Sequence, residues 1–242
     1  MEEKPITMWH VWTLLAIPPV LFLVVIIAAS VYFGMITGGD AQAITENVTR
    51  STASLLLIVQ IILLLIFGAT LRAERLPIRL IGWQIASGQK LWQEIIIGAL
   101  LGVTLAFLYF SILSPLMITA QQVLGDYVPP GELLPSLGGA VLPFLLANVI
   151  LAPFVEENIY RGYGITRLQQ RFSTPVAIVI SCFFFGLLHW AGGFWYIVLT
   201  GIVAGGLFAG LFVWRKNIVT AYAAHLALNL VEFLYVWLWI SR

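Results

Sequence analysis

The chain has 242 residues, of which 61% are hydrophobic and only 10% carry a charge. A soluble domain carries about 25% charged residues, so this composition excludes a soluble protein and indicates one integral membrane bundle. The net charge of +1 offers no basic surface, and no nucleic-acid partner is expected.

Apolar runs of about 20 residues, the length that crosses the hydrocarbon core, recur along the whole chain. Because lipid leaves backbone polar groups without partners, such runs must be helices rather than open sheet. We therefore predict an all-α fold, a polytopic transmembrane helix bundle with about seven spans. The predicted spans are 9–35, 53–71, 92–118, 138–160, 174–194, 195–214 and 217–240. The fourth run could extend towards residue 170 as a partly exposed helix.

Lysine and arginine are distributed unevenly between the two sides of this bundle. One side has only Arg50 and Arg242. The other side receives Lys4, Arg72, Arg75, Arg79, Lys90, Arg167, Arg171, Arg215 and Lys216. Basic loops favour the cytoplasm, so we predict a cytoplasmic N-terminus and an external C-terminus. The basic segment 71–93 also contains apolar residues and is equally typical of an amphipathic surface stretch or a charged loop.

The run 156–161, E-E-N-I-Y-R, places two carboxylates and an arginine in a segment that should lie in the bilayer. Ionisable groups are costly there, so they are functional candidates by default. Glu157 and Arg161 are four residues apart with the glutamate first, which is the favourable order for a helical ion pair. Glu156 and Glu157 point about 100° apart on a helix. Two carboxylates this close do not both ionise easily, and one of them can serve as a general base.

Later apolar spans contribute His189, His225 and Asn229. At about 1.5 Å per residue, Glu156 lies roughly 16–22 Å from the basic boundary of its span. On the same measure, His189 lies roughly 22–27 Å in and His225 roughly 14–15 Å in. Three helices can therefore bring these groups to a comparable depth. Asn229 shares a helix face with His225, and Glu232 lies close to that face.

Structural roles compete with a shared site at each of these positions. A Glu-Glu-Arg cluster at a helix end is commonly a solvated interfacial patch. A lone histidine in a membrane helix often only bonds a neighbouring helix. The coincidence of the three groups at one depth favours a site. Glu232 stays open between a partner of Arg161, a site residue and a packing polar group.

Four glycines in the sixth span form two pairs with a spacing of four residues. The pairs are Gly201 with Gly205 and Gly206 with Gly210. Small residues at this spacing let transmembrane helices approach closely, which predicts packing within the bundle. A dimer interface is the alternative.

These motifs together resemble the signature of the CPBP family of intramembrane proteases, which includes the CAAX-processing endopeptidases, also called the Abi or Rce1-like group. The matching runs, in the family's order, are E-E-x-x-x-R at 156–161, F-x-x-x-H at 185–189, a small-residue helix at 201–210 and H-x-x-x-N at 225–229. They cover about residues 140–230, and the first three spans carry none of them. We accordingly treat 1–242 as a single membrane domain, with N-terminal helices over 1–137 and a catalytic core over 138–240.

The resemblance implies cleavage of a peptide bond inside the membrane, in a membrane-embedded or lipidated substrate. Prenyl-protein members remove the C-terminal tripeptide after a lipidated cysteine. By analogy, Glu156 activates water, while His189 orients that water or stabilises the oxyanion. The full set of implied catalytic residues is Glu156, Glu157, Arg161, His189, His225 and Asn229.

The remaining members of the set have supporting roles in this analogy. His225 and Asn229 complete the polar pocket, and Glu157 with Arg161 holds the first carboxylate in place. The chamber that contains them must open to the cytoplasm for water to enter.

Two mechanisms fit these residues. Two histidines and a glutamate can bind zinc with water in the fourth position, and Glu156, His189 and His225 would be the ligands. The chain has no H-E-x-x-H run, the pattern in which one helix supplies two zinc ligands. We expect a glutamate-activated water and no cofactor, with zinc as the alternative.

Two other classes of function were weighed against a protease. Intramembrane Glu, Arg and His also form proton relays in transporters, but the chain shows no internal repeat and is short for a carrier. A non-catalytic membrane scaffold or immunity protein would be favoured by a missing motif residue, and none is missing. The expected location is the bacterial cytoplasmic membrane.

Overall fold

The computed structural model of the chain describes residues 8–125, 141–235 and 237–238. These residues form helices and loops without any strand, which confirms the predicted all-α fold. In this described part, six helical segments are long and apolar enough to cross a membrane. Their bounds are Met8–Ile36, Ala41–Glu74, Leu91–Leu124, Val141–Leu168, Phe194–Arg215 and Ile218–Tyr235.

Three of the segments are single helices and three are composite. The single helices are α1 (Met8–Ile36), α2 (Ala41–Glu74) and α11 (Ile218–Tyr235). The third segment joins α3 (Leu91–Leu108), the π-helix η2 (Tyr109–Leu113) and α4 (Ser114–Leu124). The fourth joins α5 (Val141–Phe144), π-helix η3 (Leu145–Leu151), α6 (Ala152–Glu156), π-helix η4 (Glu157–Ile165) and α7 (Thr166–Leu168). The fifth joins α9 (Phe194–Leu199), π-helix η6 (Thr200–Ala204) and α10 (Gly205–Arg215).

The predicted span over 174–194 is shorter in the structure. Helix α8 (Thr174–Leu188) has 15 residues and gives way to a 3₁₀ turn, η5 (Trp190–Gly192). Gly193, with φ of 88°, ends this turn before α9. Left-handed backbone is readily available to glycine, so the chain reverses direction here instead of completing a full span.

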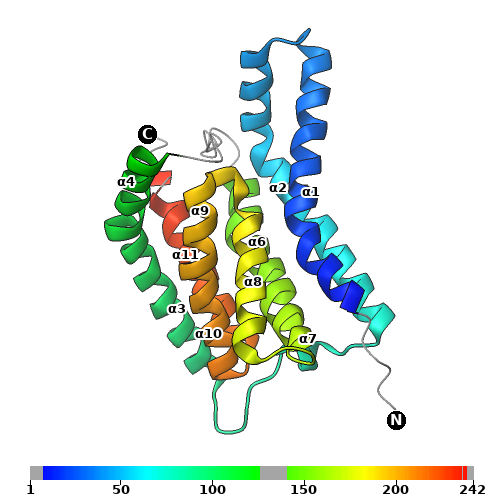
Figure 1. Cartoon of the computed structure of the whole chain (residues 1–242), viewed down its shortest axis with the longest axis vertical. Helices are drawn as coiled ribbons and strands as arrows, with labels where there is room; N and C mark the ends of the chain where they lie inside the picture. Colours follow the sequence, from blue (N-terminus) through cyan, green and yellow to red (C-terminus); the bar gives the residue numbers. More distant parts are fainter. Residues whose placement is uncertain (1–7, 126–140, 236, 239–242) are drawn as a thin grey trace.

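Helix α2 is longer than predicted, because it begins at Ala41 rather than near residue 53. Its first turns are polar and do not form an apolar run. Asp40 caps them, and its carboxylate accepts hydrogen bonds from the backbone N–H of Gln42 at 2.9 Å and of Ala43 at 3.2 Å. An N-cap of this kind satisfies donors that the helix itself leaves free. Figure 1 shows the α1–α2 hairpin extending beyond the rest of the bundle.

The basic loops gather at one end of the bundle. The start of α1, the α2–α3 loop, α7 and the α10–α11 turn all lie at the bottom of Figure 1. We call this the basic end and the opposite side the far end. The far end holds the α1–α2 turn and the end of α4. This arrangement agrees with the charge asymmetry from which the orientation is predicted.

Between α2 and α3, where the sequence is equally typical of an amphipathic surface stretch or a charged loop, the chain forms a folded loop. After α2 it forms a short 3₁₀ helix, η1 (Ile78–Ile81), whose last residue is fully buried. The Trp83 indole N–H then donates to the side-chain oxygen of Asn158 at 2.7 Å. The Gly82 carbonyl accepts from the backbone N–H of Ile218 at 3.0 Å. The loop therefore packs into the base of the bundle, beneath the helix that carries the first motif.

The four glycines of the fifth segment divide into two groups. A Cβ at Gly201 would lie 3.0 Å from the Cys182 carbonyl oxygen, and one at Gly205 would lie 3.4 Å from the Cys182 sulfur. A Cβ at Gly206 or Gly210 would meet nothing within 4 Å. Packing within the bundle is thus confirmed for the first pair, while the second pair faces open space.

Helices α3 and α11 approach closely at two glycines whose role the sequence did not predict. An added Cβ would lie 2.3 Å from the Thr220 carbonyl oxygen at Gly98, and 2.0 Å from the Ala224 carbonyl oxygen at Gly102. Backbone cannot move aside as a flexible side chain can. Only glycine lets α3 and α11 approach this closely.

We expect Gly102→Ala to destabilise the protein by about 1–3 kcal/mol, because the new methyl group forces α3 away from α11. Thermal unfolding in detergent measures the effect. Gly206→Ala is the matched control, since its methyl group meets open space and alanine favours a helix. Equal melting temperatures for the two variants would contradict the close packing.

Candidate active site

The helix that carries the first motif is not a regular α-helix. The π-helices η3 and η4 lie on either side of the five-residue α6. Pro153 in α6 has no N–H with which to continue an α-helical hydrogen-bond ladder. In η4, a Cβ at Gly164 would lie 2.9 Å from the carbonyl oxygen of Ile159, five residues earlier. Wide turns of this kind are rare and occur frequently at functional sites.

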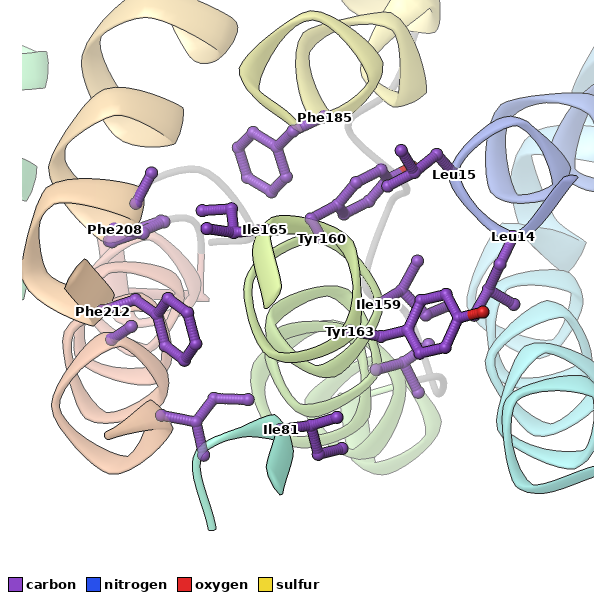
Figure 2. Close-up of a cluster of buried hydrophobic side chains, with 14 of the residues drawn as sticks. Leu14, Leu15, Ile81, Ile159, Tyr160, Tyr163, Ile165, Phe185, Phe208 and Phe212 are labelled. Carbon is purple, nitrogen blue, oxygen red and sulfur yellow. The ribbon is translucent and has the colours of Figure 1, made fainter. Parts of the chain in front are cut away.

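The π-helix η4 is enclosed by buried apolar side chains from several elements (Figure 2). They come from α1, the α2–α3 loop, α8 and α10. The enclosing residues are Leu14, Leu15, Ile81, Phe185, Phe208 and Phe212, each buried. The charged residues on this helix therefore lie in the core of the bundle, not in a solvated interfacial patch.

Glu157 and Arg161 form the ion pair that their spacing predicts. The Arg161 Nη1 donates to Oε1 of Glu157 at 3.0 Å, and both side chains are 0% exposed. The second terminal nitrogen, Nη2, donates to the carbonyl oxygen of Gly205 at 3.2 Å. The guanidinium carbon also lies 3.9 Å from the centre of the Phe185 ring. Arg161 thus ties the motif helix to α10 and α8.

His225 is bound to the same carboxylate. Its Nδ1 lies 2.8 Å from Oε1 of Glu157, and its ring stacks on Phe208 with a centroid distance of 4.7 Å. An ionised carboxylate only accepts hydrogen bonds, so Nδ1 carries the proton. In the neutral ring, Nε2 is then left with a free lone pair.

His189 has a similar arrangement at the end of α8. Its Nδ1 lies 2.8 Å from the carbonyl oxygen of Phe185, in the preceding turn. A carbonyl oxygen is also only an acceptor, so here too Nδ1 holds the proton and Nε2 of the neutral ring is an acceptor. Both imidazoles are therefore oriented by bonds to their Nδ1 atoms.

A cavity of about 510 Å³ lies against Glu156 and His189. Glu156 is only 6% exposed, and its Oε2 has no hydrogen-bond partner among the described residues. A second carboxylate, Glu232, stands on the same wall. The apolar part of the wall includes Phe22, Leu56, Leu63, Phe110, Phe144 and Phe233.

A smaller cavity of about 50 Å³ adjoins the same residues. His189 and Glu232 border both cavities, whereas His225 and Asn229 border only the smaller one. The structure thus brings Glu156 and His189 to one cavity. His225 borders the adjoining smaller cavity and is held there by its bond to Glu157. The convergence of three helices on one region agrees with the depths expected from the sequence.

The large cavity extends from Glu156 towards the far end of the bundle. Its lining residues on the motif helix are Phe144, Asn148, Ala152 and Glu156, and this helix runs towards the basic end at α7. On α11, which starts at the basic end, the lining residues lie between 232 and 235, in the last turn.

The described wall of the cavity thus lies mainly on the far side of Glu156, and the opening of the chamber towards the cytoplasm stays a prediction. On the basic side of Glu156 the space is filled by the buried Ile81 and Tyr163 and by the bond between Trp83 and Asn158. From the α2–α3 loop, the buried Ile81 and the partly buried Trp83 contribute to this packing, whereas Ile78 and Leu80 are exposed.

One continuous stretch of chain contains Glu156, the buried ion pair, His189, His225 and Asn229, and a comparison with protein-family models matches that stretch. Residues 138–231 match the model described as type II CAAX prenyl endopeptidase Rce1-like. Over these residues the chain is similar to the Rce1-like family. The predicted family is confirmed, and it indicates a protease of the CAAX type. Comparisons with curated proteins and with solved structures gave no match.

The Rce1-like segment does not assemble the predicted zinc ligands. Within the described residues, no group of three or more His, Cys, Asp or Glu side chains is placed to hold a metal ion. Glu156, His189 and His225 are divided between two cavities. Glu156 and His189 share the larger cavity, whereas His225 borders only the smaller one.

Two residues of uncertain role now have definite positions. The Asn229 side-chain nitrogen donates to the carbonyl oxygen of Asn148 at 2.8 Å, which links α11 to η3. Glu232 lines both cavities of the Rce1-like site and is not the partner of Arg161, whose bonds go to Glu157 and Gly205.

The sequence patterns did not predict one polar residue of the cavity wall. Gln60, on α2, is 4% exposed, and its side-chain oxygen lacks a partner in the described part of the chain. It lies outside the family match, on a span without any motif. The only sequence feature that could have indicated Gln60 as a cavity residue is its polar side chain inside an apolar run.

Proposed function

We propose that this chain is an intramembrane endopeptidase of the bacterial cytoplasmic membrane. It hydrolyses a peptide bond of a membrane-embedded or lipidated substrate, as CAAX-processing enzymes do. The main support is Glu156, which lines a mainly apolar cavity together with His189 and has one carboxylate oxygen without a partner among the described residues. A base, an imidazole and an apolar chamber are what hydrolysis of a lipid-borne peptide requires.

In this mechanism Glu156 accepts a proton from a water molecule while the water oxygen attacks the carbonyl carbon of the scissile bond. The resulting tetrahedral oxyanion collapses, the carbon–nitrogen bond breaks, and the proton passes from Glu156 to the leaving amine. The water oxygen and one hydrogen end in the new carboxyl group, and the other hydrogen ends in the new amine. The Glu156 carboxylate is regenerated. Fixed dipoles stabilise the oxyanion more strongly in such a low-dielectric site than in water.

The hydrogen bonds of the histidines favour one role for His189 over the other. With Nδ1 bound to the Phe185 carbonyl, Nε2 of the neutral ring accepts a hydrogen bond and can orient the attacking water. Stabilising an oxyanion would require Nε2 to be protonated. Glu157, Arg161 and His225 act as positioning residues, because their bonds hold the motif helix in place.

Cleavage of a synthetic peptide by the purified protein in detergent tests the proposal. The substrates are a farnesylated peptide and a transmembrane peptide, and products are identified by mass spectrometry. In ¹⁸O-labelled water, we expect one labelled oxygen in the new carboxyl group. Intact peptides after prolonged incubation with folded protein would contradict the proposal.

We expect cleavage to persist when a strong chelator is titrated into this assay, because the mechanism uses no metal. The remaining activity is measured after dialysis against the chelator and again after zinc is added back. Loss of activity that only zinc restores would replace the glutamate mechanism with a metal-dependent one. It would leave the proposed endopeptidase function intact.

A further inference from the structure

The large cavity has an unusual charge balance. Among the described residues, its wall contains two carboxylates, Glu156 and Glu232, but no lysine or arginine. Arg161 cannot supply a cation, because it is fully buried and both Nη atoms are bound. Arg50, in the far half of α2, points to solvent with its side chain 73% exposed.

This balance matters for the end of a bound peptide. A substrate cut three residues from its C-terminus brings a free carboxylate close to the scissile bond. In this cavity that carboxylate would meet two other carboxylates and no cation from the described part of the chain. A buried charge without a partner is strongly unfavourable. The cavity is therefore poorly suited to a free C-terminus, although its volume and apolar wall suit a peptide.

Glu232 favours a positively charged group on the ligand instead of a carboxylate. It borders both cavities, next to His189, and accepts no hydrogen bond from the described residues. Residue 232 lies one position beyond the family match, which ends at 231, so the match assigns it no role. A carboxylate without a partner in an apolar chamber favours a cationic group on the ligand.

We propose that the cavity takes an internal stretch of a hydrophobic peptide that carries a lysine or arginine near the scissile bond, and that Glu232 binds this basic side chain. The inference rests on the proposed endopeptidase function and narrows its substrate class. The apolar wall contacts the flanking residues of the substrate, and the Glu232 carboxylate binds a positively charged side chain in preference to a neutral or negative one. The preferred substrate is then a membrane protein segment cut internally rather than one trimmed at its C-terminus.

A set of matched peptides tests this specificity. All share one apolar sequence and a C-terminal amide, and they carry either lysine or norleucine at each position flanking the bond. A further norleucine peptide ends in a free carboxylate three residues after the bond. We expect kcat/KM for the best lysine peptide to exceed that of its norleucine counterpart by at least about tenfold.

Two variants at position 232 and one control locate the source of the preference. Glu232→Gln should reduce the lysine-to-norleucine ratio to about one. Glu232→Lys should instead favour the carboxylate-terminated peptide, a gain that misfolding cannot produce. Glu46→Gln, on an exposed turn of α2, should leave the ratio as in the wild type.

The outcomes separate the two proposals. Equal cleavage of all peptides by the wild type, or fastest cleavage of the carboxylate-terminated one, overturns the inference and keeps the endopeptidase. A lysine preference that Glu232→Gln leaves intact also overturns it. Failure of the folded wild type to cut any peptide overturns the endopeptidase and this inference with it.

Discussion

Peptide cleavage should fall by about 10²–10⁴-fold in Glu156→Gln, because an amide cannot take the proton from water. The substitution keeps the size of the side chain. One carboxylate oxygen of Glu156 has no partner among the described residues, so the amide disrupts no buried network. The loss should therefore appear in kcat, while the melting temperature in detergent changes little.

Single-turnover cleavage followed by mass spectrometry measures this loss. Glu46→Gln, the same chemical change on an exposed turn of α2, is the control and should keep full activity. Cleavage by Glu156→Gln at more than about a tenth of the wild-type rate would remove Glu156 as the base.

The second large effect concerns stability. Arg161→Met should destabilise the fold by about 3–5 kcal/mol, because it leaves the fully buried Glu157 carboxylate without its cation. The double variant Arg161→Met/Glu157→Gln removes the uncompensated charge as well. It should recover most of the lost stability, since a neutral amide can still accept the hydrogen bond from His225.

The chain offers a matched control for this experiment. Arg50 and Glu46 form a second pair with the same spacing of four residues, at 3.9 Å, but with side chains that are 73% and 52% exposed. Arg50→Met should change stability by at most about 1 kcal/mol. Thermal unfolding in detergent compares the variants. Similar losses for Arg161→Met and Arg50→Met would show that burial does not strengthen the inner pair.

Local sequence patterns predicted much of this molecule. Apolar length gave the membrane helices, and the spacing of Glu157 and Arg161 gave their ion pair. The grouping of Glu156 with His189 followed from their depth along two helices. Each of these features depends on helical geometry within one segment or on the depth of a residue along its span. Neither requires knowledge of tertiary packing.

Features that depend on tertiary contacts could not be predicted in this way. The wide turns of η3 and η4 depend on how the motif helix packs against its neighbours, and α-helical geometry was assumed there. The burial of Ile81 and the partial burial of Trp83 arise from contacts with residues far away in the sequence. The position of the cavity, on the far side of Glu156, follows from that packing.

The short helix α8 has a consequence for the surrounding lipid. Its 15 residues span about 22 Å, less than the hydrocarbon thickness of about 30 Å. A bilayer meets such a mismatch by thinning locally. Headgroups and their hydration shell would then dip beside η5, next to His189 and the cavity. The deformed lipid itself could deliver water to Glu156 from the far side, where no aqueous pore is needed.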